Sequence, residues 1–276
     1  MHFAVPPRSP RLATFVSTLG YYESALPAGR DRVLPGGGTG LMVNLHEDEF
    51  RTYHGPGATA VRRAPGAVLT GAEERAVVID TADQRRGLSV TFTPAGAATF
   101  FGLPLDAAAG QLVGLAELWG RDGAVLRDRL LDEADPRQQF AVLEEVLLRH
   151  MRGQSAGLPA HAAAIGHAAA ELSLGRRVRD VGNEPGLSPR TFTRRFRDHT
   201  GLTPKRYARI QRLQRVLATV EPGHPVDWAA LAAVLGSGLP SACAPRRANA
   251  TDQPPRQGLL PANSRGRRGH VGPLLR

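Results

Sequence analysis

The chain is poor in cysteine, in lysine and in long hydrophobic runs. Cys243 is the only cysteine among 276 residues, which excludes a disulfide framework and a zinc site of several thiolates, and fits a reducing cytoplasm. No run of about 18 apolar residues occurs, and residues 1–10 contain prolines but no apolar signal-peptide core. We therefore expect a cytoplasmic protein with no membrane partner.

Positive charge is abundant but unevenly distributed. Lys205 is the only lysine among 35 basic residues, and G/C-rich arginine codons account for part of the arginine excess. Residues 1–172 carry 16 basic and 19 acidic groups, whereas residues 173–220 carry 12 basic and 3 acidic groups. Codon bias would not produce this asymmetry, so the basic segment indicates a polyanionic partner such as nucleic acid, with a solvated charged face as the alternative.

Residues 12–101 consist of short apolar runs between turn signals, which is typical of a small β-barrel or sandwich. Strand-like runs lie at 41–45, 67–69, 76–79 and 88–92. Helical spacing follows: one helix is predicted from Leu112, Leu115 and Trp119, and a second from Phe140, Leu143 and Leu147, opened by Asp135-Pro136. The fold class is therefore α+β, with a β-rich sensing or dimerisation domain over residues 1–153 and helices packed on it or on a second subunit.

A helix-turn-helix is predicted after a break at 154–159 and an alanine-rich helix near 159–174. Ser188 is a good N-cap, Pro189 suits the first helical position, and Gly201 can adopt the left-handed conformation that ends a helix. Upstream, Val178 and Val181 indicate a short helix that ends at a glycine turn.

The two faces of the helix that begins at Ser188 differ in chemistry. Phe192 and Phe196 are four residues apart and are expected to be buried. The outer face then carries Arg190, Thr193, Arg194 and Arg197, and an arginine in a major groove can donate twice to guanine. An ordinary basic surface helix is the alternative.

A further helix is predicted from Thr203-Pro204, with its apolar stripe on Tyr207, Ile210, Leu213 and Leu217. Its remaining surface carries Lys205, Arg206, Arg209, Arg212 and Arg215, which are expected to contact DNA phosphates.

Enzymatic and metal sites have weaker support. The glycine run 36–40 lacks the lysine of a phosphate-binding loop and predicts a turn. His46, Glu47, Asp48, Glu49 and His54 could suggest a metal site, but a solvated acidic loop explains them more simply. We expect no metal, no cofactor and no catalysis.

The pattern GLSPRTFxRRFxxxxGLTPxxY over residues 186–207, followed by RLQR, resembles the first helix-turn-helix and linker helix of AraC-type transcription regulators. The resemblance extends over residues 159–236 and implies that Arg190, Thr193 and Arg194 face DNA bases. Residues 11–150 are similar to an uncharacterised N-terminal domain of some members. Two departures stand out: Gly182 and Pro185 disfavour the first helix of the motif, and no second recognition helix follows Gly236.

Residues 227–236 would then be the first helix of an incomplete second helix-turn-helix. Residues 237–276 contain six prolines and five glycines without periodicity, so a disordered tail is expected, and a frameshift is one hypothesis for its origin. The expected function is a sequence-specific transcription regulator that binds double-stranded DNA as a homodimer and responds to a small-molecule effector. The alternative is a ligand-binding or dimerisation protein that has lost effective DNA binding through truncation.

Overall fold

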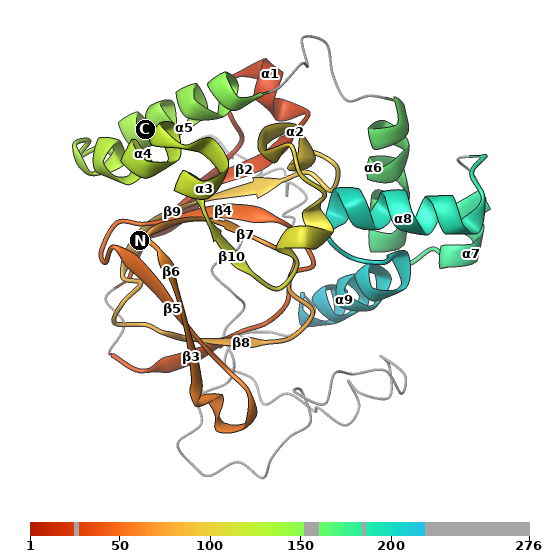
Figure 1. Cartoon of the computed structure of the whole chain (residues 1–276), viewed down its shortest axis with the longest axis horizontal. Helices are drawn as coiled ribbons and strands as arrows, with labels where there is room; N and C mark the ends of the chain where they lie inside the picture. Colours follow the sequence, from red (N-terminus) through yellow and green to blue (C-terminus); the bar gives the residue numbers. More distant parts are fainter. Residues whose placement is uncertain (25–27, 152–159, 184–185, 219–276) are drawn as a thin grey trace, which may run out of the picture.

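The computed structural model of the chain describes residues 1–24, 28–151, 160–183 and 186–218 (Figure 1). The predicted linker at 154–159, the helix expected at 227–236 and the tail 237–276 lie outside these residues. Two antiparallel sheets and several covering helices make up the first part of the chain, and a helical part follows, so the α+β prediction is confirmed. Within the described segments, no helix is both long enough and apolar enough to cross a bilayer.

The larger sheet has six strands in the order β1-β2-β9-β4-β7-β10, all paired antiparallel. Its strands, in chain order, are β1 (His2–Val5), β2 (Val16–Glu23), β4 (Gly40–Asn44), β7 (Ala67–Thr70), β9 (Arg86–Phe92) and β10 (Leu112–Gly114). The centre pairs β2 with β9, where Leu19 lies opposite Val90, and β9 with β4, where Leu41 lies opposite Val90. These three side chains share one face of the sheet because side chains alternate along a strand.

The smaller sheet has four strands in the order β3-β8-β5-β6 and lies below the larger one in Figure 1. Its strands are β3 (Arg30–Val33), β5 (Glu49–His54), β6 (Ala60–Pro65) and β8 (Val77–Asp80), with the short helix η1 (Pro56–Ala58) between β5 and β6. The sequence predicted β4, β7, β8 and β9, whereas β1, β2, β3, β5 and β6 were not assigned individually.

Helices cover the face of the larger sheet that carries Leu19, Leu41 and Val90, and together they enclose the main hydrophobic core. They are α1 (Pro10–Ala13), α2 (Ala98–Phe101), α3 (Leu115–Trp119), α4 (Arg121–Leu131) and α5 (Pro136–His150). Helix α5 begins as predicted, because the Asp135 side chain accepts a hydrogen bond from the Arg137 amide at 2.9 Å.

The single helix predicted from Leu112 to Trp119 is wrong in its first half. Leu112 lies in strand β10, opposite Thr70 of β7, and the helix begins only at Leu115. Pairing with the sheet edge satisfies backbone groups of residues 112–114, which a periodic pattern of side chains cannot reveal. Gly120, with φ +59°, then separates α3 from α4.

The helical part lies at the right of Figure 1 and packs against one end of the sheets. It comprises α6 (Ala160–Ser173), α7 (Val178–Asn183), α8 (Pro189–Thr200) and α9 (Pro204–Leu217). Between the two parts lies the short helix η2 (Leu105–Ala108), which contacts α8. The helices predicted at 159–174, after Ser188 and after Thr203 are all confirmed.

Candidate nucleic-acid interface

Helix α8 has defined ends, and both were predicted from the sequence. The Ser188 Oγ accepts a hydrogen bond from the Thr191 amide at 3.3 Å, which satisfies one of the free donors of the first turn. At the other end, Gly201 adopts φ +78° and its amide donates to the Arg197 carbonyl at 2.8 Å. Both ends of the helix are therefore fixed by hydrogen bonds to residues next to it in the chain.

The inner face of α8 is aromatic, as predicted. Phe192 and Phe196 are 2% and 0% exposed, and the Phe196 ring meets Tyr207 of α9 edge-on at 5.5 Å between centroids. Gly182 of α7 lies against Phe192, because a Cβ there would be 3.3 Å from the ring. A glycine at this position thus allows α7 and α8 to pack closely, at some cost to the helical propensity of α7, which is six residues long. Pro185 lies outside the described residues.

Helix α6 packs against both α8 and α9. Ser173 and Tyr207 place their hydroxyl oxygens 3.2 Å apart, and burial raises the pKa of Tyr207. His161 meets the ring of His199 edge-on at 5.4 Å. Burial, then electrostatic repulsion from His199 and Arg195, lowers the pKa of His161.

The outer face of α8 presents the predicted base-reading side chains to solvent. Arg190, Thr193 and Arg194 are exposed, and the Thr193 hydroxyl donates to the Pro189 carbonyl at 2.8 Å. Neither Arg190 nor Arg194 forms an ion pair with any described residue. Two exposed guanidiniums on the N-terminal half of a short helix suit the geometry by which a recognition helix reaches base edges.

Helix α9 is amphipathic as predicted. Tyr207, Ile210, Leu213 and Leu217 are buried. The exposed positions include every basic residue of the helix: Lys205, Arg206, Arg209, Arg212 and Arg215. The Thr203 side chain caps its start by accepting from the Arg206 amide at 3.4 Å. Helices α8 and α9, each capped at its start by a side chain, therefore carry a dense set of exposed cations.

Two of the predicted DNA-contacting arginines have partners that the sequence did not indicate. Arg197 lies 3.0 Å from the Asp106 carboxylate of η2, and Arg206 lies 2.6 Å from the Glu74 carboxylate, which follows β7. Both acidic residues belong to the β-rich part of the chain. Glu74 and Arg206 are 132 positions apart, and no local pattern could have paired them.

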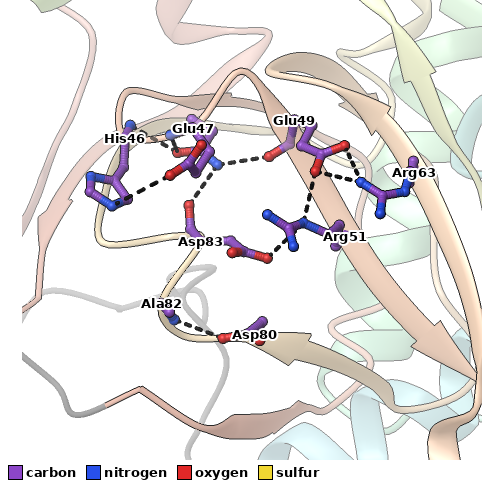
Figure 2. A network of polar contacts seen from close by, with 9 residues as sticks. His46, Glu47, Glu49, Arg51, Arg63, Asp80, Ala82 and Asp83 are labelled. Atoms are coloured by element: carbon purple, nitrogen blue, oxygen red, sulfur yellow. Dashed lines mark hydrogen bonds and ion pairs between the residues drawn. The ribbon is translucent and has the colours of Figure 1, made fainter.

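The acidic loop considered as a metal site forms an ion-pair network instead. Figure 2 shows Arg51 between the carboxylates of Glu49 and Asp83, at 2.8 and 3.0 Å. Arg63 donates to both oxygens of the Glu49 carboxylate, at 2.6 and 2.8 Å. The Arg63 hydrogen bond holds the pKa of Glu49 below its usual value. His54 bonds to Thr52 at 2.9 Å instead of joining the loop. Across the described segments, no group of three His, Cys, Asp or Glu side chains is arranged to hold a metal ion.

Two kinds of known module match the chain. Residues 181–238 match the helix-turn-helix domain family, and residues 4–114 match a domain of unknown function, DUF6597. No curated protein matches significantly.

Two solved structures are similar at low identity. ToxT from Vibrio cholerae O395 is 11% identical, with 76% of this chain and 84% of that chain covered and a TM-score of 0.37. The AraC-like transcriptional activator CuxR is 12% identical, with 73% and 77% covered and a TM-score of 0.28.

Fold and site thus define a protein in which a β-rich part precedes a helix-turn-helix module. In family terms, the chain carries a helix-turn-helix domain behind a domain of unknown function.

Proposed function

We propose that the protein is a sequence-specific transcription regulator whose helix α8 enters the major groove of double-stranded DNA. The observation that carries this proposal is the exposure of Arg190 and Arg194 on a helix capped at Ser188 and Gly201, where neither guanidinium pairs with a carboxylate of the described residues. Their guanidiniums, with the Thr193 hydroxyl, read base edges. Arg197, Lys205 and Arg206 contact phosphates, which supply most of the affinity.

The β-rich part over residues 1–153 acts, in this proposal, as a sensing or dimerising half that answers a small-molecule effector, with the helix-turn-helix domain at 159–236. Its close packing on α8 and α9 supports this role, since a change in the β-rich part can be transmitted to the DNA-reading helix. The module has no catalytic task in this scheme.

Anisotropy titration of the full chain against its own promoter duplex and a scrambled duplex, at two salt concentrations, tests the proposal. Tighter binding to the promoter, weakened on both duplexes by salt, is expected. Equal affinity for both duplexes would favour the alternative, a ligand-binding or dimerisation protein without effective DNA function. Absence of binding at low salt would remove the proposal.

Two single substitutions separate base reading from phosphate binding. Arg194→Ala is expected to reduce the preference for the promoter by about 1–3 kcal/mol, because a bidentate base contact is lost. Lys205→Ala is expected to weaken both duplexes alike and to reduce the salt slope by about 1, because one phosphate contact is lost. The reverse pattern in the same titrations would show that the roles of the two residues are misassigned.

A further inference from the structure

We propose that the β-rich part restrains DNA binding by holding two phosphate-contacting arginines of the helix-turn-helix on its own carboxylates. Asp106 pairs with Arg197 and Glu74 pairs with Arg206. This inference rests on the proposed function, because it assigns to both arginines a second, competing anion: the DNA backbone.

The charges of the two parts favour such a contact. Residues 1–172 carry 3 more acidic than basic groups, and residues 173–220 carry 9 more basic than acidic groups. Carboxylate and phosphate groups both present two oxygens that accept hydrogen bonds from one guanidinium, so the same arginine can bind either group. An arginine held by Asp106 or Glu74 must release that partner before it can neutralise a phosphate.

Apolar contacts place the carboxylates where they can compete. Ala72, the second residue after β7, is 0% exposed and belongs to the hydrophobic cluster of the helix-turn-helix. A Cβ built on Gly201, at the end of α8, would lie 3.2 Å from the Ala72 methyl and from the Leu105 carbonyl oxygen. The C-terminal end of α8 is therefore seated on the β-rich part, with Asp106 next to Leu105 and Glu74 two residues from Ala72.

Helix α9 is held on the same part through polar contacts. Gln211 and Gln214 donate to the carbonyls of Gly36 and Pro35, at 3.1 and 2.7 Å. Leu34 packs with Leu213 and Leu217 nearby. The glycine-rich loop after β3 therefore fixes the position of the helix from which Arg206 projects.

The contact affects one half of the DNA-reading surface more than the other. Arg190 and Arg194, near the start of α8, have no ionic partner among the described residues, whereas Arg197 near its end is paired. Base reading is thus left open and phosphate binding is restrained. The restraint is expected to lower affinity for every duplex by a similar factor instead of changing sequence preference.

The test compares two double variants of the full chain by anisotropy titration with the promoter duplex and a scrambled duplex across a salt series. Glu74→Gln with Asp106→Asn removes both carboxylate charges and keeps side-chain volume. The matched control, Glu117→Gln with Asp128→Asn, removes the same charge from exposed residues of α3 and α4 that form no ion pair with described residues.

Release of the arginines is expected to tighten binding of both duplexes about two- to twenty-fold more than the control does, since each exposed ion pair shifts an equilibrium by up to about fivefold. The salt slope is also expected to steepen by up to about 2, because two more phosphates are neutralised. The single variants Glu74→Gln and Asp106→Asn should each give part of both effects.

Equal gains in the test and control variants, with unchanged salt slopes, would overturn the restraint and leave the proposed function standing. Failure of the wild type and of both double variants to bind either duplex at low salt would instead reject the proposed function and the restraint together.

Discussion

Tyr22 illustrates how one buried polar atom influences stability. Its side chain is 2% exposed, and burial raises its pKa well above the usual tyrosine value. The hydroxyl lies over Gly87, where a Cβ would come within 2.5 Å of it, and it has no hydrogen-bond partner among the described residues. The neighbouring Tyr21 hydroxyl, in contrast, donates to Glu23 at 3.2 Å.

Tyr22→Phe is therefore expected to keep or raise the free energy of unfolding at pH 7, by up to about 1 kcal/mol, because it removes an unpaired buried hydroxyl. The unfolded chain loses the Tyr22 proton near pH 10 while the folded chain retains it, so wild-type stability falls as pH rises above about 10. The variant should lack this part of the fall.

Urea denaturation at pH 7 and at about pH 10.5 measures both effects. Tyr21→Phe serves as the control and should lose about 0.5–1.5 kcal/mol at pH 7, because it gives up a hydrogen bond. A loss of comparable size in Tyr22→Phe would mean that its hydroxyl is bonded.

The elements differ in how much of their extent is decided locally. Helix α8 begins where the Ser188 side chain accepts a hydrogen bond from a free amide. It ends where the Gly201 amide donates to a free carbonyl. The segment from Leu112 to Trp119 has a helical pattern throughout, yet residues 112–114 join the sheet because the edge of β7 offers partners there. An unpaired sheet edge can override a side-chain pattern of only a few residues.

Ser188→Ala is expected to lower the free energy of unfolding by about 1 kcal/mol, because the Thr191 amide loses its acceptor. Ser188→Asn keeps a capping oxygen and should retain most of the stability. Urea denaturation, followed by far-ultraviolet circular dichroism, provides the comparison. If both variants lost the same free energy, a capping role for Ser188 would be excluded.

In the whole molecule, the two parts meet where the end of α8 rests on the turn after β7 and on η2. Gly201 lies at this junction with φ +78°, close to Ala72 and Leu105. Gly186, before α8, also has a positive φ of +64°, but a Cβ there would have no atom of the described residues, its chain neighbours aside, within 4 Å. A substitution at Gly186 therefore measures backbone strain alone, whereas one at Gly201 measures backbone strain together with crowding between the two parts.

Gly186→Ala is expected to cost about 1–2 kcal/mol of unfolding free energy, the price of a left-handed alanine. Gly201→Ala should cost more, because its methyl also presses on Ala72 and on the Leu105 carbonyl. Urea denaturation of both variants measures the difference. Equal losses of unfolding free energy would indicate that Ala72 and Leu105 move aside for the methyl group without a measurable penalty.

Residues near one another in the chain were sufficient to predict the ends of α8, its aromatic inner face and the exposed arginines, because caps and helical faces depend on neighbours within four positions. Strand β1 and its pairing with β2 could not be predicted, since the register depends on residues 14 to 20 positions apart. The same reason applies to the arginines. Their exposure follows from helical spacing, but the pairing of Arg197 and Arg206 with Asp106 and Glu74 exists only because packing of Ala72 and Leu105 on α8 and its flanking glycine brings distant charges together.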